Sequence, residues 1–216
     1  MTRVLTQEQA RESLLDGRTS LVDTRSAPEF SRGHPAGALC VPYSERGFAT
    51  RIRVVEPDVA AVIVVGLTEG ELSGAVRQLG ESGITMMGQA PAEGVWWAEV
   101  GVGWQVLPER SIDGLAGTGE TVVIDVREPM EWETGHVPSA VLIPLSELHE
   151  RADAIPRGED TDVVLICETG IRSATAASIL QKAGYTNVAH APQGTAGIRR
   201  DGGALEYPQA TAMEAT

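Results

Sequence analysis

Short apolar runs and longer amphipathic segments alternate along the 216 residues of the chain. The apolar runs are rich in valine and isoleucine and too short for helices, which is typical of buried β-strands. They include "LVDTR" (21–25), "AVIVV" (61–65), "VVIDV" (122–126) and "VVLIC" (163–167). Helical stretches stand between these runs, and this alternation predicts an α/β fold built on mainly parallel sheets.

The segment "VVLICETGIRSATAASILQKAG" (163–184) combines both patterns around a cysteine. The run 163–166 predicts a buried strand, and the alanine-rich run 173–183 predicts a helix that stops at Gly184. Cys167 therefore lies where a strand passes into the N-terminus of a helix. In α/β proteins, ligands and reactive groups gather at this end of the strands.

The first residues, "MTRVLTQEQARESLLDG" (1–17), predict an amphipathic helix, because Thr6 and Gln9 have the spacing of a capping box. The segment lacks the apolar centre of a signal peptide. No apolar run approaches the roughly 20 residues that a bilayer requires. We therefore expect a cytoplasmic protein.

The chain also repeats itself. Residues 21–45, "LVDTRSAPEFSRGHPAGALCVPYSE", align without a gap with residues 123–147, "VIDVREPMEWETGHVPSAVLIPLSE". Identical pairs include Asp23 with Asp125, Arg25 with Arg127, Glu29 with Glu131, Gly33 with Gly135 and His34 with His136. After a slip of one residue the similarity resumes, where Leu79 and Gly83 match Leu180 and Gly184. Long internal repeats of this kind indicate two copies of one structural unit.

Two units of about 100 residues each suit the usual size of a domain. We place their join near "VLPERS" (106–111), so the first domain spans 1–107 and the second 108–216. The last residues, "YPQATAMEAT" (207–216), predict a frayed tail.

Charge and cysteine content narrow the classes of function. The formal net charge of −13 repels nucleic acid and anionic lipid, so neither nucleic acid nor a membrane is expected as a partner. The two cysteines, Cys40 and Cys167, are too few for a disulfide framework. No Cys/His cluster has metal-ligand spacing, and we expect neither a metal nor another cofactor.

Three motifs follow one another in the second copy: "VIDVREPMEWETGHVPSAVLIP", "ICETGIRSA" and "GYTNVAHAPQGTAGIRRDGG". An Asp-x-Arg strand end, a Gly-His turn and a Cys-x-x-Gly-x-Arg loop, in this order, resemble the rhodanese family of sulfurtransferases over nearly all of 112–207. The resemblance implies two tandem rhodanese-like domains, each a mainly parallel sheet flanked by helices. Ile198 departs from the family pattern, which usually has tryptophan there; the first copy aligns Trp97 with it.

The two copies differ at the cysteine loop. "VVGLTEGELSGAV" in the first copy aligns with "LICETGIRSATAA" in the second. Cys167 falls opposite Gly66, or opposite Val65 in the alternative register, and Arg172 falls opposite Glu71. The first copy thus has neither nucleophile nor cation there, and it resembles the inactive copies of tandem family members.

The loop that follows the second-copy strand suits a sulfur nucleophile. The N–H groups and dipole of a helix N-terminus favour a thiolate, which is the reactive form of cysteine. Gly170 permits a curl that points N–H groups inward, and Arg172 adds a permanent cation. We predict that Cys167 and Arg172 are catalytic. The predicted anion-binding loop comprises Glu168, Thr169, Gly170, Ile171 and Ser173.

The resemblance implies two displacements through a persulfide on Cys167. The cysteine takes sulfane sulfur from thiosulfate or a persulfide donor, and a thiol, cyanide or a sulfur-carrier protein removes it. No separate general base is nominated. An acidic Glu168 beside the cysteine disfavours a small dianion such as thiosulfate unless its side chain points outward.

Two other classes of function stay open. One is a binding or regulatory module whose rhodanese fold no longer turns over. The other is a cysteine phosphatase or arsenate reductase. The spacing from Cys167 to Arg172 is Cys-x4-Arg, one residue shorter than the Cys-x5-Arg of phosphatases of related architecture, and it favours sulfur over phosphate chemistry.

Several motif residues are expected to support the fold. The first copy keeps the counterparts of Asp125, Arg127 and His136 although it lacks the nucleophile, so an ion pair and a packing role are predicted for them. Arg199 and Arg200 are either solvated or draw an anionic donor towards the loop. The tryptophans expected in core and interdomain packing are Trp96, Trp97 and Trp104. A sharper hypothesis is that one of these indoles walls the cysteine pocket from across the domain interface.

Overall fold

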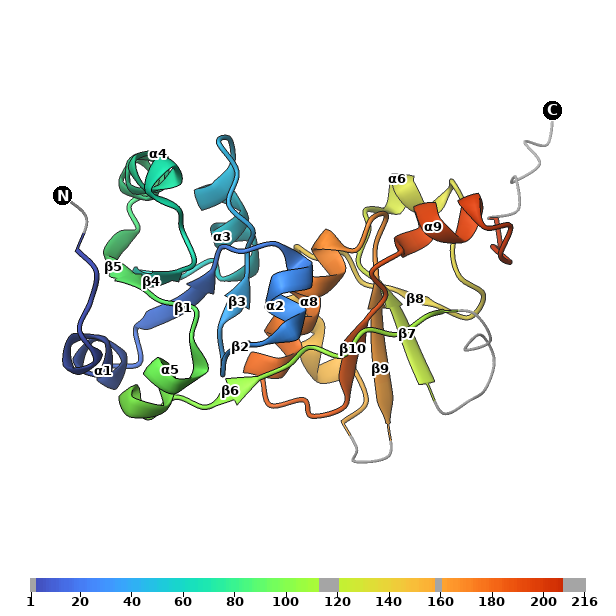
Figure 1. Cartoon of the computed structure of the whole chain (residues 1–216). Helices are drawn as coiled ribbons and strands as arrows, with labels where there is room; N and C mark the ends of the chain where they lie inside the picture. The colour runs from blue at the N-terminus through green and yellow to red at the C-terminus, as the bar shows by residue number, and fades with distance from the viewer. Residues whose placement is uncertain (1–2, 113–120, 158–160, 208–216) are drawn as a thin grey trace.

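A computed structural model describes residues 3–112, 121–157 and 161–207, and it arranges them around two four-stranded sheets (Figure 1). The strands within each sheet run parallel, and helices flank both sheets. The predicted α/β fold with mainly parallel sheets is therefore confirmed. A short antiparallel pair, β2 (His34–Pro35) with β6 (Trp104–Gln105), lies beside the first sheet.

The first sheet has the strand order β3-β1-β4-β5. Its strands are β1 (Thr19–Asp23), β3 (Leu39–Cys40), β4 (Ala61–Val65) and β5 (Thr85–Ala90). The helices around it are α1 (Gln7–Leu15), α2 (Ala27–Arg32), α3 (Phe48–Val55), α4 (Glu69–Glu81) and α5 (Gly94–Val100). Helix α1 begins at the predicted capping box, where the Gln9 amide donates to Thr6 Oγ1 at 3.3 Å and the Thr6 amide donates to Gln9 Oε1 at 3.1 Å.

The second sheet repeats this topology, because its order β10-β9-β7-β8 matches the first when read from the other edge. Its strands are β7 (Thr121–Asp125), β8 (Val141–Leu142), β9 (Asp162–Ile166) and β10 (Val188–His190). Its helices are α6 (Pro129–Trp132), α7 (Leu148–Arg151), α8 (Ile171–Lys182) and α9 (Gly194–Arg200), with a 3-10 turn, η1 (Ala152–Ala154), after α7. Helix α8 starts two residues before the predicted start at 173, because Gly170 ends the loop in a left-handed conformation.

Helix α8 lies between the two sheets, beside α2 and β3 in the centre of Figure 1. Every residue from Ser173 to Leu180 is buried. A helix that is buried all round needs neighbours on every side, and α8 packs on β9 and β10 of its own sheet and on β3 of the other. β3 is an edge strand of the first sheet, and α8 supplies a partner for its backbone: the Cys40 amide donates to Ser178 Oγ at 2.9 Å.

The two halves share one apolar core. A single cluster of buried side chains runs from Leu5 in the first half to Val188 in the second. At its edge, Lys182 Nζ lies 2.6 Å from Glu56 Oε1 and 3.1 Å from Ser20 Oγ. This continuous packing fixes the second half against the first.

The predicted join runs beside β10 as an added stretch of backbone. The His190 amide donates to the Pro108 carbonyl and the Arg110 amide donates to the His190 carbonyl, both at 3.0 Å. The domain limits 1–107 and 108–216 remain our proposal, since the join itself pairs with the second sheet. Of the predicted tail, residues 208–216 lie outside the described residues.

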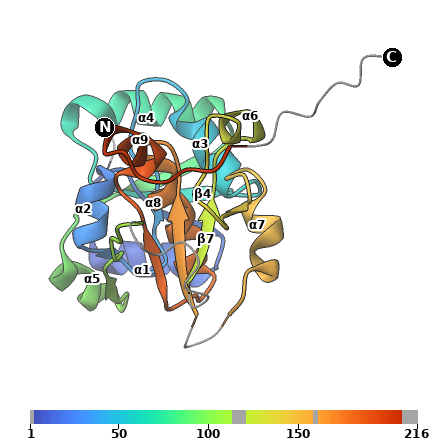
Figure 2. The ribbon, with the colours of Figure 1, turned by 90° about the vertical axis from the view of Figure 1, so that its right-hand side faces the viewer.

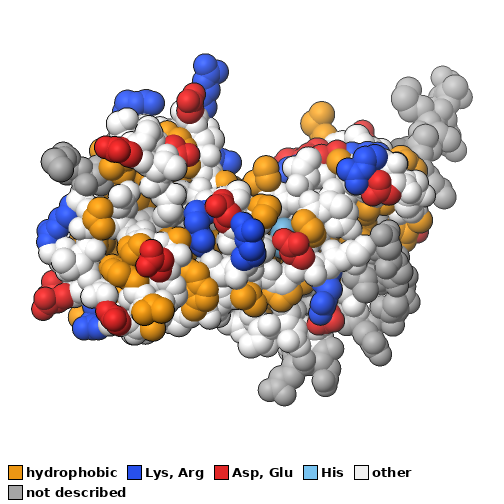
Figure 3. All heavy atoms as spheres, in the orientation of Figure 1, with side chains coloured by type: hydrophobic (Ala, Val, Ile, Leu, Met, Phe, Trp, Pro, Cys, Tyr) orange, Lys and Arg blue, Asp and Glu red, His pale blue; other side chains and the backbone are white. Residues whose placement is uncertain are grey.

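The second half carries two helices, α6 and α9, at the same end of its strands (Figure 2). On the face drawn in Figure 3, lysine and arginine side chains lie singly or beside acidic ones. Within the described ranges, no helix is long and apolar enough to cross a membrane.

Replacing Ser178 with alanine tests the contact between α8 and the first sheet. We expect Ser178→Ala to lower the free energy of unfolding by about 1–3 kcal/mol, because the buried Cys40 amide loses its acceptor. Urea denaturation measures this change. The matched control is Ser13→Ala: both serines donate to a carbonyl of their own helix, but Ser178 also accepts the Cys40 amide. A control change beyond about 0.5 kcal/mol, or equal losses in both variants, would contradict the prediction.

Candidate active site

Cys167 directly follows β9, and its side chain is 1% exposed. Its Sγ accepts hydrogen bonds from the backbone amides of Gly170 at 3.2 Å and Ser173 at 3.4 Å. The thiol also donates to Ser173 Oγ at 3.7 Å. Of the predicted loop residues, the structure thus places Gly170 and Ser173 in contact with the sulfur. Amides at the start of α8, which have no partner within the helix, converge on Sγ.

The loop is held from outside by the N-terminus of α9. The Thr195 amide donates to the Cys167 carbonyl at 2.9 Å, and the Ala196 amide donates to the Glu168 carbonyl at 3.0 Å. Two glycines permit this close approach. A Cβ on Gly170, at φ +87°, would lie 2.4 Å from the Pro192 carbonyl oxygen, and a Cβ on Gly194, at φ +60°, would lie 2.2 Å from that of Glu168.

The carboxylate of Glu168 is bound away from the sulfur by three partners. Thr195 Oγ1 donates to Oε2 at 2.6 Å, Arg199 pairs with Oε1, and Arg127 Nη1 lies 3.4 Å from Oε2. The sequence left the direction of this side chain open. Its charge is balanced by two guanidinium groups, which weakens the electrostatic argument against an anionic donor. Arg200 instead pairs with Asp201 at the surface.

Arg172 lies in the first turn of α8, and its guanidinium forms a two-pronged ion pair with Glu131 of α6. The donor–acceptor distances are 2.7 and 2.6 Å. The hydrogen bond to Glu131 raises the pKa of Arg172, and the same contact lowers the pKa of Glu131 to about 2. The predicted cation is therefore next to the loop, but its charge is already paired.

The Asp125–Arg127 ion pair is buried beneath the loop. Arg127 Nη2 lies 2.7 Å from Asp125 Oδ2, both side chains are 0% exposed, and Nη2 also donates to the Gly135 carbonyl at 2.9 Å. The predicted ion pair is confirmed. His136 stacks on Trp132 with ring centroids 3.8 Å apart, which agrees with the packing role expected for it.

The structure also settles the register between the copies at the loop. Val65 pairs with Asp23, and Ile166 pairs with Asp125, so Gly66 is the counterpart of Cys167. Gly66 has φ +85°, and a Cβ there would lie 2.4 Å from Cγ of Arg25. The arginine of the first copy thus occupies the space that a cysteine side chain would need.

His190, at the end of β10, is a site residue that the sequence reasoning missed. Its ring is 1% exposed and joins two hydroxyl groups: Nδ1 is 3.3 Å from Ser173 Oγ, and Nε2 is 3.1 Å from Ser31 Oγ of α2. Burial lowers the pKa of His190. A signal was present, because the aligned position of the first copy is Gln89 and this histidine belongs to the second copy alone.

A pocket of about 230 Å³ lies beside the loop, between the two halves. The second half contributes Thr169, Gly170, Ile171, His190 and Pro192, and the first half contributes Ser26, Ala27, Pro28 and Pro42. None of these lining residues is a tryptophan, so the hypothesis of an indole wall gains no support. Trp97 instead is buried in the first half, where its indole N–H donates to the Pro91 carbonyl at 2.8 Å.

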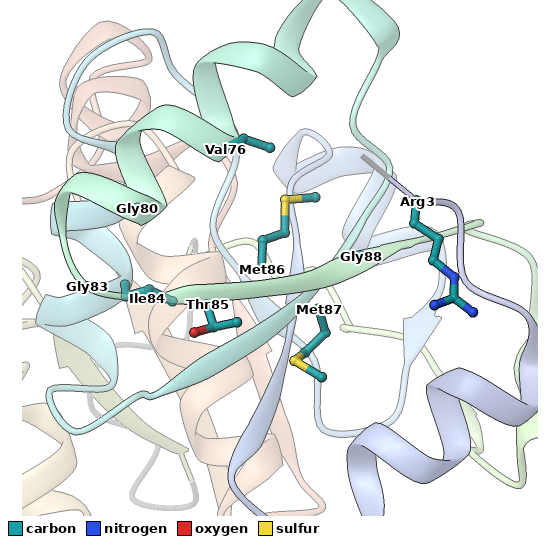
Figure 4. A pocket seen from close by; sticks show the side chains of 9 residues that line it. All are labelled: Arg3, Val76, Gly80, Gly83, Ile84, Thr85, Met86, Met87 and Gly88. Atoms are coloured by element: carbon teal, nitrogen blue, oxygen red, sulfur yellow. The ribbon is translucent and has the colours of Figure 1, made fainter. Parts of the chain in front are cut away.

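A more open hollow of about 590 Å³ follows β5, at the edge of the first sheet away from α8 (Figure 4). Met86 and Met87 point to opposite sides of the strand, and Arg3 lies at one end. No cysteine, histidine or carboxylate is among the residues that line it, whereas the smaller pocket is lined by residues of the cysteine loop. Among the described residues, no group of three or more His, Cys, Asp or Glu side chains could hold a metal ion.

Comparison with known proteins gives the same family as the motifs around Cys167. The family described as Rhodanese-like domain matches residues 110–201. A protein named Sulfurtransferase from Allochromatium vinosum is 33% identical over 95 residues, which are 44% of this chain and 87% of that protein. The probable adenylyltransferase/sulfurtransferase MoeZ of Mycobacterium tuberculosis is 34% identical over 93 residues, 43% of this chain. The chain spans only 24% of the length of MoeZ.

Among solved structures, a thiosulfate sulfurtransferase from Pseudomonas aeruginosa aligns with 96% of this chain and 44% of its own, at 24% identity and a TM-score of 0.42. The family assignment rests on the sequence relatives, and above all on the Allochromatium protein, which the chain covers almost completely. The chain therefore belongs to the rhodanese-like sulfurtransferase family.

Proposed function

We propose that the protein transfers sulfane sulfur through a persulfide on Cys167. The observation that carries the proposal is the amide cradle, in which the N–H groups of Gly170 and Ser173 point at Sγ from 3.2 and 3.4 Å. Such donors at a helix N-terminus stabilise negative charge on sulfur, both as a thiolate and as a persulfide.

The reaction has two displacements. The Cys167 thiolate attacks the outer sulfur of the donor, a sulfur–sulfur bond forms on the cysteine, and the bond within the donor breaks. The leaving group, a thiolate or sulfite, takes the bonding electron pair. A thiolate or cyanide then attacks the outer sulfur of the persulfide and regenerates the Cys167 thiolate. Each of the two displacements therefore leaves the enzyme in the state that the other displacement needs.

Charge around the loop supports a persulfide donor over thiosulfate. Arg172 is engaged by Glu131 and Arg199 by Glu168, so both cations already have anionic partners. The pocket beside the loop is lined by no arginine, lysine or carboxylate. A low-molecular-weight or protein-bound persulfide, whose reacting end carries less charge than thiosulfate, suits this environment better.

Arg172 keeps its proposed catalytic role as a cation held next to the loop rather than bound to the sulfur. Its forked pair with Glu131 fixes the guanidinium at the first turn of α8, where its field favours the anionic sulfur. The chemistry calls for no cofactor. A sulfur-carrier protein as acceptor and a cytoplasmic location remain part of the proposal.

One observation favours a second function, a binding module without turnover. Cys167 is 1% exposed, so a donor reaches the sulfur only if the pocket or the loop admits it. A rhodanese fold that holds its cysteine closed would bind partners without transferring sulfur.

Intact-protein mass separates the two functions. Reduced protein is incubated with thiosulfate and, separately, with a small-molecule persulfide. We expect a gain of one sulfur atom that cyanide removes and that Cys167→Ser abolishes, with the persulfide loading faster than thiosulfate. Cys40→Ala is the matched control, because burial raises the pKa of the Cys40 thiol and leaves it unreactive. No gain from folded protein with either donor would favour the binding module.

The Glu131–Arg172 ion pair predicts a pH dependence of stability. The pKa of Glu131 falls from an ordinary 4.5 to about 2 in the folded protein, chiefly through its hydrogen bond with Arg172. A depressed carboxyl pKa contributes stability that is fully present above 4.5 and is lost as the pH falls towards 2. Unfolding free energies of wild type and Glu131→Gln should therefore differ more at about pH 7 than at about pH 3.

Glu29→Gln serves as the comparison for this measurement. Glu29 lies at the equivalent position of the first copy, and its pKa is lowered by hydrogen bonds from Ser26, without a facing arginine side chain of the Arg172 kind. Its effect should be smaller. A difference between wild type and Glu131→Gln that is constant across pH would show that the ion pair contributes nothing.

A further inference from the structure

We propose that His190 accepts the proton of Cys167 through Ser173, and that Ser31 of the first copy orients the imidazole for this task. The inference rests on the proposed function, since it assigns the base that makes the sulfur nucleophilic. It also gives the first copy a part in the site, although that copy has no cysteine at its own loop.

The four residues form a continuous chain of polar contacts. Sγ of Cys167 is 3.7 Å from Ser173 Oγ, which is 3.3 Å from Nδ1 of His190. Nε2 on the other side of the ring is 3.1 Å from Ser31 Oγ. All four side chains are buried.

The proposed transfer requires one tautomer of His190, and the two contacts of the ring are compatible with it. When Nε2 carries the proton and donates it to Ser31 Oγ, the lone pair of Nδ1 faces Ser173 Oγ and accepts from it. Ser31 Oγ accepts from Nε2–H in the form of His190 that can take up a proton on the side of the cysteine.

The proton transfer balances without any further reactant. The proton of Sγ moves to Ser173 Oγ, while the proton that Ser173 carried moves to Nδ1 of His190. The bonding electron pair of the S–H bond stays on sulfur, which becomes the thiolate held by the Gly170 and Ser173 amides. The reverse path returns the proton when the thiolate is released from the second displacement.

The surroundings of the ring suit a reversible acceptor. Burial lowers the pKa of His190, whereas the Gly170 backbone and Glu109 from the join between the halves, with Oε1 3.8 Å from Nε2, act in the opposite direction. The elements packed against the ring contribute Ser31 from α2 and Ser173 from α8. Ser173 Oγ also connects the ring to the ionisable thiol of Cys167, because it contacts both Nδ1 and Sγ.

A purely structural role explains less of this arrangement. Ser173 Oγ lies within hydrogen-bond distance of both the Gly170 carbonyl, at 3.0 Å, and Nδ1 of His190, at 3.3 Å, so rotation of its hydroxyl redirects the proton from the carbonyl to the imidazole. The first copy completes the same sheet with Gln89 at the aligned position. The histidine is present in the copy that has the cysteine, and its ring points at the residue that contacts the sulfur.

The pH dependence of Cys167 alkylation by iodoacetamide tests the inference, in a Cys40→Ala background so that a single thiol reacts. His190→Asn keeps a polar group for both serines but removes the base. We expect its alkylation midpoint to rise by about one pH unit, which makes alkylation roughly tenfold slower near neutral pH. Ser173→Ala should shift the midpoint in the same direction, and Ser31→Ala should shift it less, because the imidazole remains.

The matched control is His34→Asn. His34 is a buried histidine of the first copy that bonds to the Phe30 carbonyl and stacks on the Phe30 ring, without contact to the cysteine loop. Its loss should lower thermal stability and leave the midpoint unchanged. An unshifted midpoint in folded His190→Asn overturns the inference; if that variant does not fold, an unshifted midpoint in Ser31→Ala and Ser173→Ala does so.

Alkylation needs no sulfur donor, so this test stands apart from the proposed function. A shifted midpoint in protein that gains no sulfur from either donor would uphold the proton acceptor and reject the transferase. Sulfur loading with an unshifted midpoint would uphold the transferase and reject His190 as the proton acceptor.

Discussion

The burial of α8 between the two sheets is the constraint on which the rest of the structure depends. Only alanine, serine, threonine and a few aliphatic side chains fit where both faces of a helix are enclosed, and residues 173–180 supply them. At the N-terminus of the helix the sulfur of Cys167 is itself buried, and the Gly170 and Ser173 amides meet it there. In a medium of low dielectric constant these dipoles act more strongly on a charged sulfur than they would at a surface.

The charged groups around the loop are arranged so that they cancel. Each arginine forms an ion pair with one carboxylate: Arg127 with Asp125, Arg172 with Glu131, and Arg199 with Glu168. Each cation remains near the sulfur, but none is left unpaired there. The stabilisation of an anionic sulfur therefore depends chiefly on fixed amides, which need not reorganise when charge develops.

The two copies have the same strand order and differ in the loops that follow β4 and β9. Both retain the Asp-Arg ion pair and the stacked histidine, which hold the turn after the first strand of each sheet. In the first copy a glycine follows β4, and Arg25 fills the space above it. That half instead covers α8, closes the pocket and places Ser31 against His190. The first copy, which has glycine opposite Cys167, thus lines part of the pocket beside the loop of the second copy.

The sequence by itself determined the strands, the internal repeat, the buried ion pair and the position of Cys167 at the start of α8, because these depend on local periodicity and on short motifs. Tertiary structure decided the partners of the charged and polar side chains. Arg172 meets Glu131 from 41 residues away, and His190 meets Ser31 from 159 residues away. Such contacts depend on how sheets and helices pack. The direction in which a long side chain points cannot be inferred from its position in the sequence. The same reason hid the direction of Glu168 and the first copy's contribution to the site.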